Sequence, residues 1–306
     1  MSDPISLRMG GYGPATTSFS RALKRIGDRL EAELGDAVEI HTVCNILDFG
    51  YRAEDILWLV EHGVLTLGYQ SSSYLTDRIP ELGVADLPFL FANAQRARTA
   101  IDGRLGAFLT RAIEQRAGYR VLGYFENGFR HLSNRLRPVH GPADLVGMKI
   151  RVLPSAVHAR TFELLGTAPL RLDLTDALRA IAAGSVDAQE NPLANTVTYG
   201  VHRHHRLHSL TGHFYVSRPI FVHAATFDAW PAALRQAVRD AVIDAVAFQR
   251  QLATEEERAA RAAIADAGCE ILELTPDAHD AFVAAVHPLR AEARKIYGDA
   301  LKLVES

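Results

Sequence analysis

The sequence predicts an α/β fold with a mostly parallel sheet, and its length predicts two lobes. Short stretches of alternating apolar residues, the pattern of strands, recur between longer stretches that have the 3.6-residue apolar spacing of helices. This alternation of strands with helices is typical of α/β sheets. With 306 residues, 48% of them hydrophobic, the chain can form a packed core in each of two lobes.

The first third of the chain alternates strand and helix. The first helix is defined by a stripe of apolar residues, Phe19, Leu23, Ile26, Leu30 and Leu34. In chain order the predicted elements are a strand at 5–9, a glycine-rich turn at 10–14, a helix capped by Thr17 or Ser18 and stopped by Gly35, a strand at 38–42, a helix at 52–61 and a strand at 64–67.

The remaining two thirds continue this pattern and include one long helix. Helices are predicted near 94–117, at 156–165 and at 175–183, and extended segments at 120–125, 148–153 and 214–223. From Pro231 to Ala267 the chain has no internal glycine or proline. We therefore expect a helix about 50 Å long there, with a kink as the alternative. Asp228 is its expected N-cap and Gly268 its expected C-cap.

Composition and charge exclude several classes of protein. The net charge is −3 and the charges are interspersed, which disfavours nucleic acid as a partner. The sequence contains no run of about 18 apolar residues, so it predicts no transmembrane helix. Cys44 and Cys269 lie far apart without a C-x-x-C motif, so we expect two buried free thiols and no zinc site. The N-terminus carries no export signal, so the signal either was removed or never existed.

The common catalytic motifs are absent. We find no G-x-S-x-G elbow, no H-E-x-x-H and no Walker A sequence. Gly11-x-Gly13-x-x-Thr16 is half of a dinucleotide fingerprint without its third glycine, so we expect no cofactor. The histidines at 202, 204, 205 and 208 offer a metal pair at 204 and 208, but the interspersed arginines disfavour a cation. We therefore expect a solvated basic loop or helix end, no metal and no catalytic residue.

Two polar residues leave a structural and a ligand-binding interpretation open. Arg151 interrupts an apolar strand, where an arginine is seldom buried without a partner. It either forms a salt bridge to an acid such as Asp187, or faces a crevice at the end of the strand and offers two parallel donors to a carboxylate. Asn191 precedes a proline, which keeps it extended. It either forms an ordinary asparagine-proline turn or reaches a ligand.

Four segments are similar to segments of one known family, and the last three match in order and spacing. They are Asp86-Leu87-Pro88-Phe89-Leu90-Phe91, Gly128-Phe129-Arg130 with Ser133-Asn134, Asp144-Leu145-x-Gly147-x-Lys149-Ile150-Arg151-Val152, and Val186-Asp187-Ala188-Gln189-Glu190-Asn191-Pro192. Together they make the chain resemble the solute-binding proteins of tripartite ATP-independent periplasmic (TRAP) transporters, the DctP family. The resemblance covers essentially the whole chain.

The resemblance implies a fold, an activity and a location. The implied fold is the type II periplasmic-binding-protein-like fold, with two α/β lobes, a ligand cleft between the lobes and a long helix spanning both. Lobe I would comprise residues 1–128 and 217–257, and lobe II residues 129–216 and 258–306. The implied activity is the capture of an organic anion by lobe closure and its delivery to the small and large subunits of a membrane permease. We expect a monomer in the periplasm.

The resemblance also implies roles for individual residues. Arg151 falls at the position of an arginine that clamps the carboxylate, Arg130 at that of a supporting arginine, and Asn191 at that of an asparagine that hydrogen-bonds the carboxylate. Further pocket candidates are Tyr12, Gln70, Ser71, Tyr74 and Pro154. The family commonly has an aromatic residue where this chain has Leu174, so Phe214 and Tyr215 are expected to supply the aromatic wall.

The predicted ligand is an organic monocarboxylate. The polar residues Gln70, Ser71, Ser72 and Asn134 favour a hydroxylated acid such as a sugar acid. An aromatic or keto acid is an alternative, because the family binds both. Two other functions stay open. One is a cytoplasmic or sensory carboxylate-binding module without a permease. The other is an enzyme acting on a carboxylic acid, with a base near His204 or His213.

Overall fold

The computed structural model describes residues 3–304, which form two compact units. Unit 1 comprises residues 3–71, 108–126 and 217–254, and unit 2 comprises residues 72–107, 127–216 and 255–304. Residues 72–107, which the sequence-based division assigned to lobe I, therefore group with unit 2. Part of the reason is a buried contact, because Asp86 in this segment lies against His158 of unit 2. The functional lobe boundaries stay a prediction.

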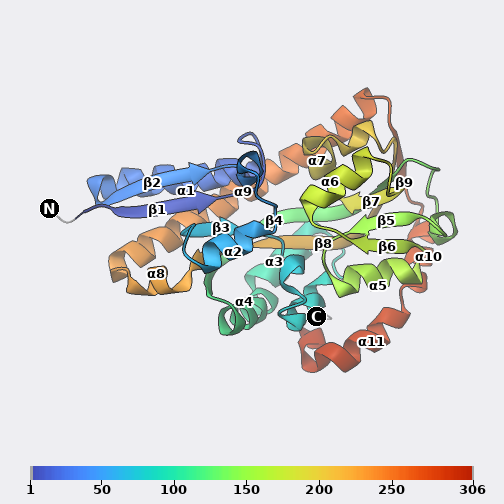
Figure 1. Cartoon of the computed structure of the whole chain (residues 1–306). Coiled ribbons are helices and arrows are strands. Elements are labelled where there is room, and N and C mark those ends of the chain that lie inside the picture. Colours follow the sequence, from blue (N-terminus) through green and yellow to red (C-terminus); the bar gives the residue numbers. More distant parts are fainter. Residues whose placement is uncertain (1–2, 305–306) are drawn as a thin grey trace. The chain divides into compact units, whose positions relative to one another are not determined.

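Unit 1 contains a sheet in the order β2-β1-β3-β8 (Figure 1). Strand β1 is parallel to both of its neighbours, and β3 is antiparallel to β8. The elements with residues in this unit are β1 (Ile5–Gly10), α1 (Ser18–Leu34), β2 (Val38–Val43), α2 (Asp55–Glu61), β3 (Leu67–Tyr69), α4 (Arg104–Arg116), β4 (Tyr119–Asn134), β8 (Leu207–His223), α8 (Ala224–Ala229) and α9 (Ala232–Asp266). Four of these, α4, β4, β8 and α9, also have residues in unit 2.

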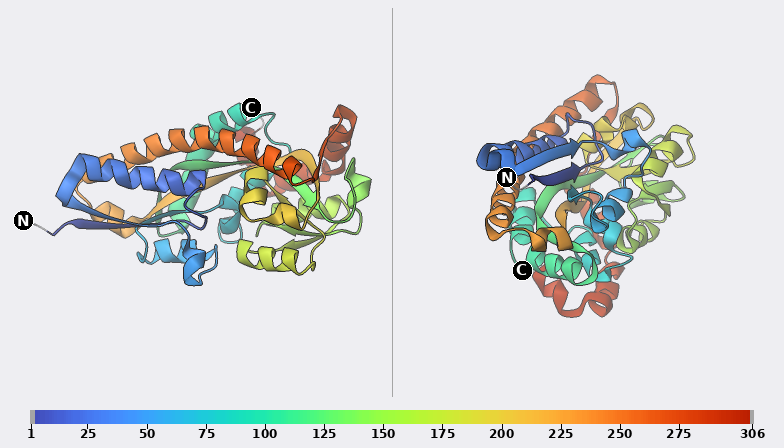
Figure 2. Two further views of the ribbon diagram at one scale, coloured as in Figure 1. Left: turned by 90° about the horizontal axis from the view of Figure 1, so that it is seen from above. Right: turned by 60° about the vertical axis from the view of Figure 1, so that its left-hand side comes forward.

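Helix α1 forms where the sequence predicts it. Thr17 is the N-cap, and its side chain accepts a hydrogen bond from the Ser20 amide. Gly35 ends the helix with a φ of 53°, a conformation that favours glycine. Four of the five predicted stripe residues, all except Leu34, are buried. Figure 2 shows α1 beside α9, and Arg25 of α1 binds Asp244 of α9 at 2.6 Å.

Unit 2 contains the strand order β4-β7-β5-β6, with β9 parallel to β8. Strands β5, β6 and β7 are mutually parallel along their pairings, and β4 is antiparallel to β7. Further elements are η3 (Ser72–Leu75), η4 (Pro80–Asp86), α3 (Ala94–Asp102), β5 (Lys149–Val152), α5 (Ala156–Leu164), β6 (Ala168–Arg171), α6 (Leu174–Ala182), β7 (Ala188–Asn191), α7 (Leu193–Thr198), η6 (Val201–Arg203), β9 (Glu270–Glu273), α10 (Pro276–Ala285) and α11 (Pro288–Tyr297).

Several boundaries differ from the prediction. The long helix α9 is continuous from Ala232 to Asp266, but Asp228 lies inside the separate helix α8 and does not cap it. The helix expected near 94–117 divides into α3 and α4 at Gly103. The strand expected at 64–67 forms instead at Leu67–Tyr69.

Two further sequence-based expectations can be checked in the described residues. Both cysteines are free, and Cys269 is buried whereas Cys44 is half-buried. No helix among residues 3–304 is both long and apolar enough to cross a membrane.

Candidate functional site

The two faces of the sheet in unit 2 carry different polar residues. Strand pairing places Arg151 of β5 next to Gln189 of β7, and Asn191 next to His131 of β4. Because successive side chains alternate between faces, Arg151, Gln189 and Asn191 share one face. Ile150 and Val152 belong to the hydrophobic core on the other face, which includes Phe162 of α5.

Arg151 is a buried cation without a carboxylate partner. The side chain is 1% exposed, and its Nε and Nη2 both donate to the carbonyl oxygen of Leu172, at 3.1 and 2.8 Å. The alternative of a salt bridge to Asp187 is wrong, because Asp187 accepts from Arg135 at 2.7 Å. Within residues 3–304 no carboxylate pairs with Arg151 and its Nη1 makes no hydrogen bond. Burying an arginine without a counter-charge is costly, so this site favours an anionic ligand.

Tyr74 adds a second donor near Arg151. Its hydroxyl oxygen accepts a hydrogen bond from the backbone amide of Leu174. Leu174 lies two residues after Leu172, whose carbonyl oxygen binds Arg151. Burial raises the pKa of Tyr74 well above its usual value, and Arg151 opposes this only in part. The hydroxyl therefore keeps its proton and can donate it to a ligand. Pro154, also predicted here, is half-buried and accepts a 3.3 Å hydrogen bond from Thr76.

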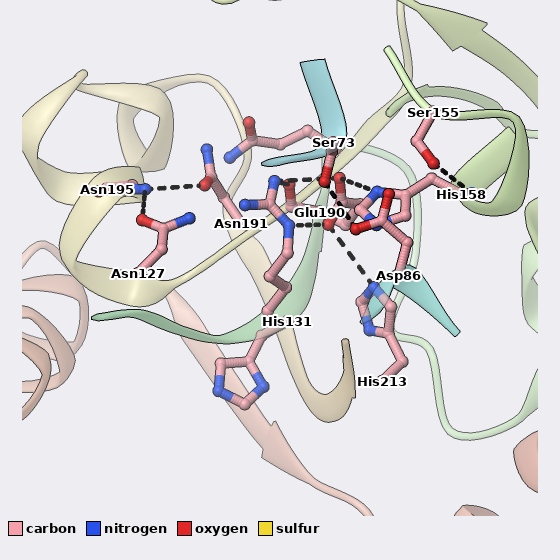
Figure 3. A network of polar contacts seen from close by, with 12 residues as sticks. Ser73, Asp86, Asn127, His131, Ser155, His158, Glu190, Asn191, Asn195 and His213 are labelled. Atoms are coloured by element: carbon pink, nitrogen blue, oxygen red, sulfur yellow. Dashed lines mark hydrogen bonds and ion pairs between the residues drawn. The ribbon is translucent and has the colours of Figure 1, made fainter. Parts of the chain in front are cut away.

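Asn191 is held by a neighbouring helix. Its Oδ1 accepts from Nδ2 of Asn195 in α7 at 3.1 Å, and the same nitrogen donates to Oδ1 of Asn127 at 3.0 Å. Figure 3 shows Asn195 next to both of these side chains. The Asn191 side chain therefore does not serve only as an asparagine-proline turn. In the described chain its Nδ2 makes no hydrogen bond, so this NH₂ group is available as a further donor.

Arg130 lies on the opposite, core-facing side of the sheet. Its partner is Glu190, whose carboxylate accepts hydrogen bonds from Nε and, at 3.0 Å, from Nη2. The backbone carbonyl oxygen of Glu190 also accepts from Nη2, at 2.6 Å. Both side chains are almost fully buried. The structure thus gives Arg130 a carboxylate from its own chain, and only Nη1 is left without a hydrogen bond within residues 3–304. Its supporting role toward a ligand stays a prediction.

Two histidines approach Glu190 from different sides (Figure 3). His158 lies 3.8 Å from Glu190 and 3.6 Å from Asp86, and His213 lies 3.8 Å from Glu190. Burial alone lowers the pKa of His158, but the two carboxylates raise it above its ordinary value overall. For His213 burial prevails and lowers the pKa. Arg130 and a protonated His158 balance the charges of Glu190 and Asp86, whereas a neutral His213 adds no charge.

Among the predicted ligand residues of unit 1, the side-chain amide of Gln70 forms hydrogen bonds within the protein. Gln70 donates to Ala53 O at 2.7 Å and accepts from the Ser71 amide at 2.9 Å, so both ends of its side chain are engaged. Ser71 is buried as well. Tyr12 packs on Tyr69 with ring centroids 5.3 Å apart.

Arg218 is a buried cation of unit 1 that the sequence analysis missed. Its guanidinium carbon lies 3.9 Å from the ring centroid of Phe19, 5.0 Å from Tyr12 and 5.8 Å from Tyr69. Cation–π contacts of this kind hold an arginine in place without neutralising it. The three rings come from separate segments of the chain, so no local signal in the sequence indicates the cluster.

Of the two residues predicted to form the aromatic wall, Phe214 packs in the core of unit 2. Its ring stacks on His158 with centroids 3.9 Å apart and planes 5° apart. Tyr215 is the next residue and, by strand alternation, points to the other side. It contacts Phe91 and Phe129 at 5.8 and 5.3 Å. Phe214 therefore has a packing role, and Tyr215 is the better candidate for a ligand contact.

The histidine segment after residue 201 is only in part the solvated basic loop or helix end that we expected, because it ends the short helix η6 at His204 but also contains two buried histidines. His205 and His208 are 0% and 1% exposed, whereas His204 is exposed. His208 lies in strand β8, so it is not one helical turn from His204. Within residues 3–304 no three metal-ligating side chains are grouped so that they could hold a metal ion.

Comparison with known proteins identifies the family. The family model for the bacterial extracellular solute-binding protein, family 7 (DctP), matches residues 10–296. The chain belongs to this family. The resemblance to the DctP solute-binding proteins of TRAP transporters is thereby confirmed, and family 7 consists of binding proteins.

Relatives of known sequence and structure agree with this family. The chain is 30% identical over 279 residues to a solute-binding protein of Verminephrobacter eiseniae, covering 91% of this chain and 82% of that protein. It is 27% identical over 267 residues to the 2,3-diketo-L-gulonate-binding periplasmic protein YiaO of Escherichia coli, covering 87% and 80%. The structure matches the sugar acid binding protein DctPAm of Advenella mimigardefordensis in complex with galactonate, with a TM-score of 0.94, 23% identity and coverage of 100% and 98%. The predicted type II fold is therefore confirmed.

Proposed function

We propose that this protein is the extracytoplasmic solute-binding component of a TRAP transporter and that it binds an organic carboxylate through Arg151. The observation that carries the proposal is a buried guanidinium without a carboxylate partner in the described chain. Tyr74 and Asn191 each add a donor in the same unit. An arginine with donors around it is suited to an anion with two acceptor oxygens, because the guanidinium binds a carboxylate through two parallel hydrogen bonds.

A sugar acid is the favoured ligand class. YiaO is named for 2,3-diketo-L-gulonate and DctPAm was crystallised with galactonate, and both compounds carry one carboxylate and several oxygens. In the mechanism that we propose, the ligand binds between two lobes, the lobes close, and the closed protein delivers the acid to the small and large permease subunits. The protein would act as a monomer in the periplasm.

The deciding experiment replaces Arg151. A thermal-shift screen of the wild-type protein against sugar, keto, hydroxy, aromatic and dicarboxylic acids first finds the ligand, because a ligand at a hundredfold excess over Kd stabilises the folded state by about 2.7 kcal/mol. Calorimetry then compares variants. Arg151→Ala should weaken binding at least about 100-fold, since each lost charged hydrogen bond contributes about 1.5–3 kcal/mol. Arg151→Lys should also fail, because an ammonium lacks the planar fork.

Arg135→Ala is the matched control. Arg135 belongs to the same unit, but its side chain is 41% exposed and pairs with Asp187, so its loss should leave binding unchanged. The folding of Arg151→Ala is checked by circular dichroism. Near-wild-type affinity in folded Arg151→Ala protein would refute the proposal.

A further inference from the structure

We propose that Asn195 is a positioning residue that turns the side-chain amide of Asn191 so that its Nδ2 faces the ligand. The consequence is a site that prefers an ionised carboxylate over the matching carboxamide. This inference rests on the proposed function, because it concerns the same group of the ligand. The structural feature behind it is the row of three amides formed by Asn127, Asn195 and Asn191 (Figure 3).

The hydrogen bonds in this row fix the direction of each amide. Nδ2 of Asn195 donates to Oδ1 of Asn191 and to Oδ1 of Asn127. An amide has one oxygen and one NH₂ group, so an Asn191 oxygen that accepts from Asn195 leaves its NH₂ group for another partner. Among residues 3–304 the Asn191 NH₂ group makes no hydrogen bond, although the residue is only 5% exposed.

Helix α7 is held in place by α9, which makes it a firm support for Asn195. Both carboxylate oxygens of Glu257 accept hydrogen bonds from the first amides of α7, those of Leu193 and Ala194, at 3.2 and 3.1 Å. The residue after Asn195 is Thr196, whose hydroxyl oxygen accepts a 3.2 Å hydrogen bond from Nε2 of Gln189. Consecutive residues of α7 therefore orient two amides of β7, Asn191 and Gln189, on the face that also carries Arg151.

The orientation decides which ligand group fits. A carboxylate offers only acceptors, so it is matched by a donor from Asn191 and by the guanidinium of Arg151. A carboxamide must direct its own NH₂ group toward one of these donors, which leaves polar groups unpaired in a buried site. If Asn191 were turned around, its oxygen would face the carboxylate and repel it, but would accept from a carboxamide.

Proton exchange in the ligand-free protein tests the orientation directly. With isotope-labelled asparagine, nuclear magnetic resonance should show protected NH₂ protons on Asn195 and rapidly exchanging NH₂ protons on Asn191. In the Asn195→Asp variant the side chain only accepts at neutral pH, so the Asn191 amide should turn around and its protons should become protected. Protected Asn191 protons in the wild-type protein would overturn the inference.

Affinity for D-galactonate and D-galactonamide tests the consequence. Asn195→Asp should weaken galactonate binding by about tenfold or more, the effect of losing one hydrogen bond to a charged group. The ratio of galactonamide to galactonate affinity should rise in this variant. Asn195→Leu, which can neither donate nor accept, is the control. It leaves Asn191 able to rotate, so it should weaken galactonate binding less and should not favour the amide.

The pH dependence separates positioning from a packing defect. From about pH 7 to about pH 5, part of the Asn195→Asp carboxyl becomes protonated and can donate to Asn191 again, so galactonate affinity should partly recover. The titratable groups around this point are Glu257 from α9, His131 from β4, 3.9 Å from Glu257, and His202, whose Nδ1 is 3.4 Å from Thr196 O. The wild type and Asn195→Leu carry the same groups, so a recovery seen in them as well would contradict the inference.

The result distinguishes this inference from the proposed function. If Arg151→Ala loses galactonate binding but Asn195→Asp binds like the wild type, the proposed function stands and the positioning role is wrong. If Arg151→Ala binds like the wild type, the proposed function is wrong, and the exchange experiment still decides how Asn191 is oriented.

Discussion

Acidification should destabilise this protein because buried histidines, His205 and His208 among them, resist protonation in the folded state. Burial lowers the pKa of His205 and of His208 to about 4, from an ordinary value of 6.5. Both rings are therefore neutral in the folded protein between these two values, whereas the unfolded chain takes up protons there. By linkage, the contribution of these two histidines to stability is fully present above pH 6.5 and is lost as the pH drops from 6.5 toward 4.

The magnitude follows from the number of protons and from the contacts of the rings. Each of the two contributes a slope that approaches about 1.4 kcal/mol per pH unit, so together they lose about 3 kcal/mol between pH 6.5 and pH 5. Burial also lowers the pKa of His131 and of His213, and these two histidines add to the loss. Domains are typically stable by about 5–15 kcal/mol, so this loss is large. Only one of the four ring nitrogens has a partner among the described residues, His205 Nδ1, which lies 3.2 Å from Ser133 Oγ. Protonation would thus bury donors that have no acceptor.

Urea unfolding followed by circular dichroism at several pH values measures this slope. His208→Leu should reduce the slope by up to about 1.4 kcal/mol per pH unit. It should cost little stability at neutral pH, because it replaces two buried nitrogens without partners. His204→Gln is the control, since His204 is an exposed histidine of the same segment. A slope that is the same in the wild type and in His208→Leu would refute the argument.

Two substitutions test the buried charges and the break between α3 and α4. Glu190→Gln should destabilise the protein by about 3–5 kcal/mol in urea unfolding, because it leaves buried cations without a counter-charge. Asp187→Asn, at a half-exposed pair, should cost at most about 1 kcal/mol, and equal effects would contradict the assignment. Gly106→Ala should lower the melting temperature, since its Cβ would lie 1.7 Å from the carbonyl oxygen of Ile101. Gly141→Ala, whose Cβ meets nothing within 4 Å, should leave the melting temperature unchanged. Equal melting temperatures of the two variants would contradict this expectation.

Elements with local signals could be predicted from the sequence, whereas elements defined by pairing could not. Helix α1 has its cap at Thr17, its apolar stripe and its stop at Gly35, and all three are properties of neighbouring residues. Strand β4 was predicted only to residue 125, because its second half contains the polar residues Glu126, Arg130 and His131. It nevertheless continues to Asn134, since its backbone pairs with β7. That pairing is made by residues about 60 positions away in sequence.

The same limit explains the partial success at the candidate site. Arg151 was predicted as a ligand residue by its motif, and the structure removes the competing salt bridge by pairing Asp187 with Arg135. The histidines were misjudged because exposure depends on packing, which the spacing of His205 and His208 does not reveal. Arg218 could not be found at all, since its three aromatic neighbours come together only in the folded chain.

The two arginines of the motif show how strand geometry can give one residue type two functions. Arg130 and Arg151 are both about 1% exposed and both lie on strands next to β7. Glu190 projects toward the face of Arg130 and neutralises it, whereas the neighbouring residues of β7 on the face of Arg151, Gln189 and Asn191, carry no charge. A one-residue shift in the register of β7 would exchange these faces. The sheet pairing therefore leaves the charge of Arg151 without a carboxylate partner among residues 3–304, which is the physical basis for the anionic ligand that we propose.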